Sequence, residues 1–155
     1  MKQTLALPPR INPNWKIGIV ASQYHDAMIQ PMIEAARATL LYAGIKEKNI
    51  VIHRAAGSFE IPLIGSALAA TGTYDALMAL GIIIEGETHH AELLATQTAH
   101  GIMEVQLDFL IPFAFEVLYV KNLAQARARI RGKNNKGTEA ALAVLHSLST
   151  LRALR

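Results

Sequence analysis

Short apolar runs alternate along the chain with longer segments of helical period, and this alternation constrains the fold more than any other feature. Four runs have the character of buried strands: Ile17 to Ala21, Ile50 to Ile52, Leu77 to Ile84 and Ile111 to Leu118. The last two are almost continuously apolar, as strands of a parallel sheet covered on both faces are. The pattern therefore favours a sheet buried between layers of helices.

Between these runs, apolar residues recur every three or four positions, which is the spacing of one helix face. Such segments run from Met28 to Ala43, with Gly44 as the stop, from Ala91 to Val105, and from Ala141 to Leu151. Strands and helices in alternation predict a doubly wound α/β sandwich with right-handed crossovers. A ligand crevice is then expected at the carboxyl ends of the strands.

The composition limits the chain to one compact domain. A length of 155 residues, 52% of them hydrophobic, suffices for one full core but not for two ordinary domains. We expect this domain to span residues 14–155. Residues 1–13, which carry three prolines, are expected to form a tail or an edge strand lent to a neighbour.

Charge and cysteine content narrow the function classes. The formal charge of +3 is mild, and the basic residues are scattered apart from residues 127–136, so no nucleic-acid partner is expected. The absence of cysteine excludes disulfides, thiolate catalysis and sulfur-ligated metals. The apolar stretch after Lys2 is too short for an export signal and no later run could span a membrane. A cytoplasmic protein without a membrane partner is therefore expected.

Aromatic and acidic residues follow the first two strands, where the crevice is expected. Tyr24 offers a stacking wall for a planar ligand, although an aromatic ring at a strand end also serves in packing. After the second strand comes a glycine turn at Gly57, and Pro62 then opens a helix. Glu60 in this turn can accept hydrogen bonds from ligand hydroxyls, or it can be a helix-start residue favoured by the helix dipole.

The third strand leads through Gly86 to a helix start near His90. Backbone N–H groups from Gly86 onward can bind a phosphate there without a basic side chain. A histidine beside a phosphate can transfer protons near neutral pH. His89 and His90 differ by about a hundred degrees around a helix, so at most one of them faces the crevice. A surface or capping role is the alternative for either.

A metal centre is the other interpretation of this acidic and histidine-rich stretch. Its candidate ligands are Glu85, Glu87, His89, His90 and Glu92. Their spacing lacks the two-histidine i, i+4 pattern of zinc sites, so no metal is expected. A surface or capping role is assigned to the remaining histidines, which are His25, His53, His100 and His146.

Two features near the C-terminus are ambiguous by themselves. Phe113 and Phe115 share one face of a period-two strand, which core packing explains. The basic run from Arg127 to Lys136 is typical of a solvated face, but it can also provide a local anion site.

Taken in order, these segments resemble the lumazine synthase family from about residue 15 to the C-terminus. The resemblance lies in five blocks: Ser22-Gln23-Tyr24-His25, Gly57-Ser58-Phe59-Glu60-Ile61-Pro62, Gly86-Glu87-Thr88-His89-His90, Ile111-Pro112 to Phe115, and Asn135-Lys136-Gly137 followed by Glu139-Ala140-Ala141. It implies a flavodoxin-like three-layer sandwich with a four-stranded parallel sheet and helices on both faces. It also implies a transferase of riboflavin biosynthesis. Such an enzyme condenses 5-amino-6-ribitylamino-uracil with 3,4-dihydroxy-2-butanone 4-phosphate to 6,7-dimethyl-8-ribityllumazine, phosphate and water, with no cofactor or metal.

The resemblance also implies a role for each matching residue. His90 would move protons and Arg129 would pair with the phosphate. The remaining substrate-binding positions would be Tyr24 as the stacking aromatic, Ser58, Phe59 and Glu60 for the ring and ribityl hydroxyls, Ile83 and Ile84 through their backbone, Gly86, Glu87 and Thr88 as the phosphate turn, Phe115 from the adjacent subunit, and Lys136.

The same resemblance implies a homopentamer and leaves open whether twelve pentamers close into a sixty-subunit shell. The chain departs from the family pattern at Glu85, at Glu116 and at Tyr24-His25, and the stretch from Arg129 to Asn135 is one residue short. These departures motivate an alternative, a non-catalytic relative that binds riboflavin or forms a cage. A flavodoxin-like flavin carrier is a third hypothesis that the fold alone would permit.

Overall fold

The computed structural model describes residues 5–155, which contain a four-stranded parallel sheet in the order β2-β1-β3-β4. The strands are β1 (Ile17–Ser22), β2 (Ile50–Ala55), β3 (Ala76–Ile84) and β4 (Phe113–Val120). The helices are α1 (Asp26–Tyr42), α2 (Ile61–Ala70), α3 (His90–Phe109), α4 (Leu123–Arg129) and α5 (Lys136–Ala153), with single 3-10 turns η1 (Glu47–Asn49), η2 (Ser58–Glu60) and η3 (Gly132–Asn134). The predicted α/β sandwich of flavodoxin-like topology is confirmed.

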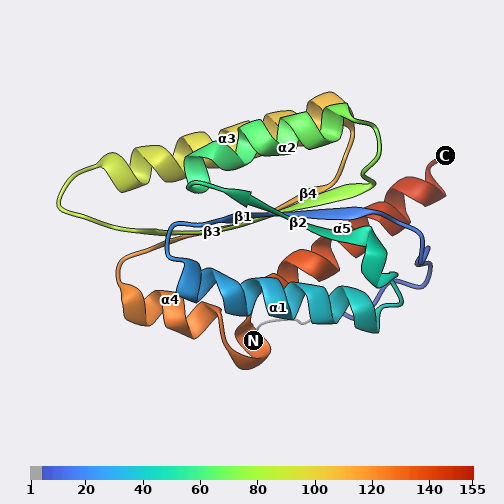
Figure 1. Cartoon of the computed structure of the whole chain (residues 1–155), viewed down its shortest axis with the longest axis horizontal. Helices are drawn as coiled ribbons and strands as arrows, with labels where there is room; N and C mark the ends of the chain where they lie inside the picture. Colours follow the sequence, from blue (N-terminus) through green and yellow to red (C-terminus); the bar gives the residue numbers. More distant parts are fainter. Residues whose placement is uncertain (1–4) are drawn as a thin grey trace.

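Helices cover the sheet on both faces, as Figure 1 shows. α2 and α3 lie on one face, and α1, α4 and α5 lie on the other. Successive side chains of a strand point to opposite faces, so β1 contributes to two cores. Ile17 and Ile19 pack with α1 and α5, whereas Val20 packs with α2 and α3. The central strands are therefore apolar at nearly every position.

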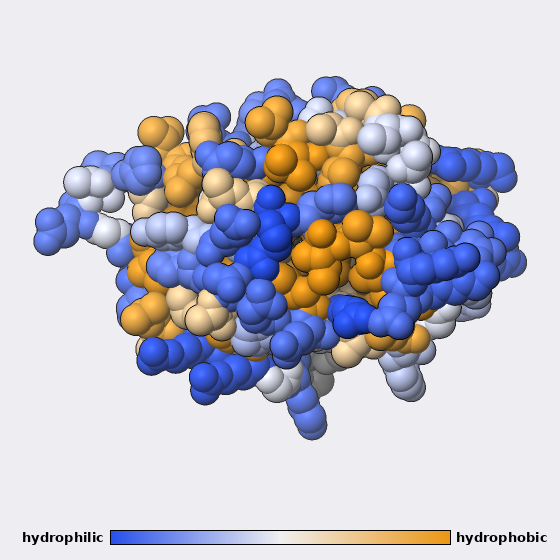
Figure 2. Space-filling view, in the orientation of Figure 1, coloured by the Kyte–Doolittle hydropathy of each residue, from blue (hydrophilic) through white to orange (hydrophobic). Residues whose placement is uncertain are grey.

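β2 is an edge strand and is longer than the sequence predicts. The apolar pattern stops at Ile52, but pairing with β1 continues through His53 and Arg54 to Ala55. An edge strand faces solvent along one side, so polar residues are tolerated in it. Figure 2 views this side of the molecule and shows apolar side chains gathered in its middle. Ile52 of β2 is 41% exposed.

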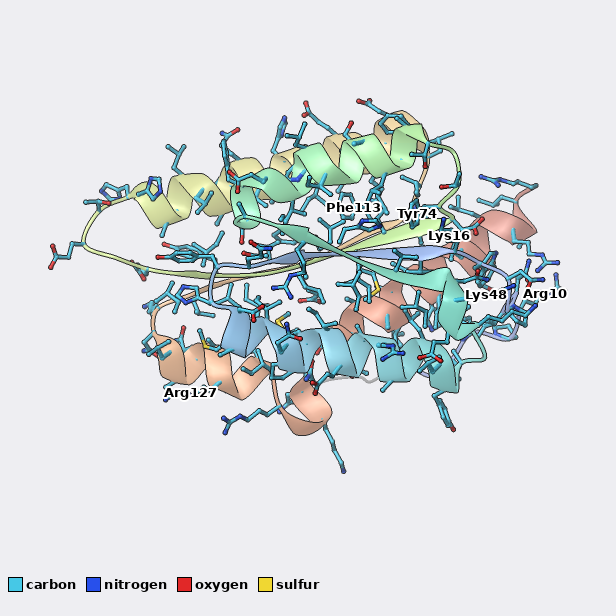
Figure 3. All side chains as sticks on the ribbon, in the orientation of Figure 1. Arg10, Lys16, Lys48, Tyr74, Phe113 and Arg127 are labelled. Atoms are coloured by element: carbon cyan, nitrogen blue, oxygen red, sulfur yellow. The ribbon has the colours of Figure 1, made fainter. Side chains whose placement is uncertain are left out.

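β4 forms the opposite edge and lies two residues later than predicted, at Phe113–Val120 instead of Ile111 to Leu118. The N–H of Ile111 donates to the Gln106 carbonyl at 3.2 Å, so this residue still belongs to the end of α3. Pro112 has no N–H to offer a ladder. Phe113 is the buried aromatic of this strand, at 2% exposure, and its ring lies between the sheet and the α2–α3 layer (Figure 3).

The long helices end and begin at residues with special backbone or packing requirements. Gly44 follows α1 with a φ of 97°, in the left-handed region that favours glycine. At the start of α5, Asn135 caps the helix by accepting the Gly137 N–H at 2.8 Å. Gly137 lies against α1, where a Cβ would come within 2.0 Å of the Met32 carbonyl oxygen. This glycine therefore allows α5 to pack directly on the α1 backbone.

The N-terminal segment, residues 5–13, forms no helix or strand. Leu7 and Ile11 pack against the α1–α5 core, and His146 Nε2 lies 2.6 Å from the Ala6 carbonyl oxygen. The first four residues of the predicted tail lie outside the described residues, and its boundary at residue 13 stays a prediction. None of the helices described here has the length and apolar character to cross a membrane.

Candidate functional site

A cavity of about 960 Å³ opens at the carboxyl ends of the strands. The connections from β1 and β3 leave toward opposite helical layers, which is the topological position where α/β sheets bind ligands. The cavity is lined mainly by apolar side chains with a few polar ones. The lining residues are Tyr24, His25, Gly57, Ser58, Phe59, Glu60, Ile82, Ile83, Ile84, His90, Ala91, Leu93, Leu94, Gln97 and Leu123.

The turn between β1 and α1 places Tyr24 at the mouth of this cavity. Its N–H donates to Ser22 Oγ at 3.1 Å, and its ring meets the His25 ring edge-on at a centroid distance of 4.6 Å. His25 adopts the left-handed conformation, with φ 61° and ψ 39°, and occupies the N-cap position of α1 without a side-chain capping hydrogen bond. Tyr24 is 68% exposed, so most of its aromatic face is available to a planar ligand.

The segment between β2 and α2 forms a second wall. Ser58 is buried, and its hydroxyl lies so close to β3 that a Cβ on Gly81 would come within 2.5 Å of Ser58 Oγ. Glu60 folds back over the turn, since a Cβ on Gly57 would lie 3.2 Å from its carboxylate. Phe59 is 60% exposed beside them. A hydroxyl, a carboxylate and an aromatic ring are thus brought to one wall.

One face of α3 forms the third wall. His90 begins the helix and lines the cavity, whereas His89 is fully exposed and pairs with Glu92 at 3.7 Å. Gln97, seven positions after His90, lies on the same face of α3 and also lines the cavity. Gln97 was not among the predicted site residues, although its helical spacing from His90 could have indicated it.

The predicted phosphate turn projects from the sheet. Residues 85–89 form an exposed loop at the end of the molecule (Figure 1), and α3 begins only at His90. Gly86, Glu87 and Thr88 do not line the cavity. The predicted helix start near His90 is confirmed, and residues 86–88 lie in the loop before it. Within residues 5–155, no three histidine or acidic side chains converge as metal ligands.

Three residues of the predicted site lie elsewhere. Phe115 is 45% exposed and lines a separate groove of about 330 Å³, between α3 and α5. It is the third residue of β4, which continues to Val120. Arg129 donates to the Gln125 carbonyl at 2.8 Å, and Lys136 pairs with Glu139. None of the three lines the cavity.

A charged pair stands directly behind the Tyr24 turn. Arg54 of β2 pairs with Asp26, the first residue of α1. The hydrogen bond from Arg54 lowers the pKa of the Asp26 carboxyl below its ordinary value, and a second hydrogen bond from Gln30 acts in the same direction. The aspartate is therefore held as the charged partner of the guanidinium.

Comparison with known proteins gives a consistent result over almost the whole chain. The family model described as 6,7-dimethyl-8-ribityllumazine synthase matches residues 14–152. A protein of that name from Chlorobium phaeobacteroides (strain DSM 266) is 37% identical over 138 residues, which cover 88% of this chain and 89% of the relative. The protein of that name from Chlorobium phaeovibrioides (strain DSM 265) is 37% identical over 140 residues, or 90% of each chain.

Proposed function

The chain belongs to the 6,7-dimethyl-8-ribityllumazine synthase family, and on this premise we propose how its residues serve riboflavin biosynthesis. Membership makes the chain a transferase that forms 6,7-dimethyl-8-ribityllumazine. The substrates follow from the family resemblance: 5-amino-6-ribitylamino-uracil and 3,4-dihydroxy-2-butanone 4-phosphate. The observation that carries the proposal is the cavity at the strand ends, because it joins two aromatic rings, a carboxylate and an imidazole.

The pyrimidine substrate occupies this cavity. Tyr24 and Phe59 are exposed aromatic side chains in its lining and provide apolar surfaces for a planar ring. Ser58 and Glu60 offer a hydroxyl and a carboxylate to the ring and the ribityl hydroxyls. The floor is made by Ile83 and Ile84 at the end of β3, whose backbone meets the ring. Gln97 adds an amide that can both donate and accept.

The condensation of the two substrates requires that they be held in position and that protons be transferred. The substrate amine attacks the ketone to form a Schiff base with loss of water, phosphate leaves by elimination, and ring closure with loss of a second water completes the lumazine. Amines and ketones react readily on their own, so holding both substrates in register is the main contribution of the enzyme. His90 at the cavity wall moves protons between the intermediates, because an imidazole changes protonation near neutral pH.

The phosphate-bearing substrate requires a second chain. Arg129, Phe115 and Lys136 do not line the cavity of their own subunit, so we assign them to the site of the adjacent subunit in a homopentamer. Arg129 then pairs with the leaving phosphate, together with the turn Gly86-Glu87-Thr88. The apolar groove around Phe115 supports this arrangement, since a partner would bury it. We place the assembly in the cytoplasm.

The direct test is turnover of the two substrates by the purified protein, followed by the absorbance of the lumazine product. Formation of lumazine and one phosphate per product supports the proposal. A yellow protein that binds flavin and gives no product would instead support the non-catalytic alternative.

Activity is expected to need no metal ion. Prolonged treatment with a chelator, followed by gel filtration, should leave the rate of lumazine formation unchanged, because acid–base groups and phosphate contacts suffice for the chemistry. Loss of activity that Zn²⁺ or Mg²⁺ restores would reassign the acidic and histidine residues near His90 to a metal centre.

A further inference from the structure

The turn that carries Tyr24 has little support of its own. Tyr24 is 68% exposed and His25 beside it holds a left-handed backbone conformation, which a residue with a Cβ adopts only when its surroundings impose it. The Ser22 hydroxyl accepts from the Tyr24 N–H at 3.1 Å and lies 3.4 Å from the Tyr24 carbonyl oxygen, so these hydrogen bonds stay within the turn. Some neighbouring element must therefore hold the turn in place.

Arg54 of β2 provides that support. It pairs with Ala21 in the parallel register, one residue before β1 ends. Its Nη2 donates to the Ser22 carbonyl oxygen at 3.0 Å and also to the Asp26 carboxylate. One guanidinium thus joins the last residue of β1 to the first residue of α1 across the three turn residues. A further hydrogen bond, from Gln23 N–H to the Ala55 carbonyl at 2.7 Å, holds the same turn against β2.

We propose that Arg54 is a positioning residue, which acts through Ser22 and Asp26 to fix the Tyr24 ring at the mouth of the cavity. The inference rests on the proposed function in one respect, that Tyr24 stacks on the pyrimidine substrate. Arg54 itself does not line the cavity, so its effect on the substrate is exerted through the turn. We call the three residues Ser22, Asp26 and Arg54 the turn clamp.

The chemistry of the clamp suits arginine. A guanidinium presents several donors in a fixed plane and can serve a carbonyl and a carboxylate at the same time. Lysine has a single point charge on a flexible stem and holds two such acceptors less rigidly. The Arg54 side chain is 26% exposed and that of Asp26 is 54% exposed, so the pair is partly shielded from water and salt.

The test compares Arg54→Met with Arg37→Met. Arg37 forms a similar ion pair with Glu47 away from the cavity, so its replacement controls for the loss of a surface arginine. Arg54→Met should raise KM for the pyrimidine substrate about tenfold while kcat stays within about twofold, because a displaced ring weakens binding more than chemistry. Arg54→Lys should be intermediate and Arg37→Met should match wild type. Thermal unfolding confirms that each variant is folded.

A double-mutant cycle tests whether the effect passes through Tyr24. In a Tyr24→Ala background, Arg54→Met should add little further change in KM, because the ring that it positions is absent. If the full effect persists in that background, or if Arg54→Met behaves like Arg37→Met, the proposal is overturned. Should Arg54→Met fail to fold, Arg54→Lys and Asp26→Asn take its place in the same cycle.

Amide hydrogen exchange separates this inference from the proposed function. Exchange in peptides that cover residues 22–26 should be faster in Arg54→Met than in wild type or Arg37→Met, whether or not substrate binds. Unchanged exchange overturns the clamp even in an active enzyme. A wild-type protein that forms no lumazine refutes the proposed function instead, and exchange alone then decides whether Arg54 holds the turn.

Discussion

At the scale of single residues, His90 lines the cavity of its own subunit and Arg129 does not. His90 lines it from the first turn of α3, whereas Arg129 lies on α4 and donates to a backbone carbonyl of its own helix. In the proposed site the imidazole relays protons and the guanidinium stabilises the departing phosphate. Water can replace the first role more readily than the second.

We therefore expect unequal losses when each side chain is removed. Arg129→Ala should lower the rate of lumazine formation at least about a hundredfold, since a charge-assisted contact to the leaving phosphate is lost. His90→Ala should lower it about tenfold, because solvent partly replaces a proton shuttle. Steady-state kinetics with both substrates measure the two effects. A near-normal Arg129→Ala enzyme would remove this residue from the phosphate site.

A second prediction at the residue scale is that His53 makes the unfolding free energy depend on pH. His53 Nε2 lies 2.7 Å from the Tyr74 hydroxyl. Lys16 lies over the Tyr74 ring, and Figure 3 labels Lys16 and Tyr74. Burial, together with the charge of Lys16, lowers the pKa of His53 from its ordinary value of 6.5. Below pH 6.5 the unfolded chain therefore binds more protons at His53 than the folded chain does. The stabilisation by neutral His53 is lost as the pH falls from 6.5 through the lowered pKa.

Urea denaturation at several pH values measures this effect. The unfolding free energy of wild type should decrease between pH values of about 7 and 5, and His53→Gln should reduce the decrease. His100→Gln, which removes an exposed histidine from α3, is the control. An identical pH dependence in wild type and His53→Gln would contradict the assignment.

At the scale of elements, the contact between α5 and α1 depends on one glycine. A Cβ at position 137 would approach the Met32 carbonyl oxygen to 2.0 Å, and this neighbour is backbone that cannot rotate away. Gly137→Ala should lower the unfolding free energy by about 1–3 kcal/mol, as overpacking does. Gly86→Ala is the matched control, because nothing lies within 4 Å of its added Cβ. Equal melting temperatures of the two variants would show that α5 shifts without cost.

The sequence predicted the central elements better than the edges. β1 and β3 are covered on both faces, so apolar residues follow one another along each strand and the sequence shows an uninterrupted apolar run. β2 extends through polar residues and β4 begins after a helix end, because pairing at an edge depends on backbone hydrogen bonds that leave no apolar signature. α4 has no long apolar face and was not predicted from periodicity.

The same limit applies to the candidate site. Strand ends indicated Tyr24 and Glu60 because the topology brings them together, and His90 followed from the helix start after β3. Gln97 was missed although its spacing from His90 on α3 could have indicated it. Arg54 was missed because it reaches its place through tertiary contacts that leave no local pattern. The phosphate role of residues 86–88 stays a prediction.

At the scale of the whole molecule, the proposed site needs two chains, and subunit mixing tests this. One variant carries Phe115→Ser and Arg129→Ala, and the other carries Tyr24→Ala and His90→Ala. If the two groups come from adjacent subunits, mixing the two impaired proteins under subunit exchange regenerates some complete sites. Recovered lumazine formation is the expected outcome.

The controls for this experiment are each variant exchanged with itself, which should gain no activity. Mass spectrometry or labelled subunits must show that mixed oligomers have formed, and sedimentation gives their size. Mixed oligomers without recovered activity would mean that all catalytic groups belong to one chain.

The two open edges of the sheet give a newly made chain unequal risks of aggregation. Among the described strands, β2 exposes Ile52 but carries His53 and Arg54 directly after it, and such charged or polar residues discourage pairing with another sheet. β4 instead exposes Phe115 and Tyr119, beside an apolar groove. Chains that have not yet formed the proposed oligomer should therefore aggregate through β4. Lower expression temperature or a chaperone that shields this edge would raise the soluble yield more than any change at β2.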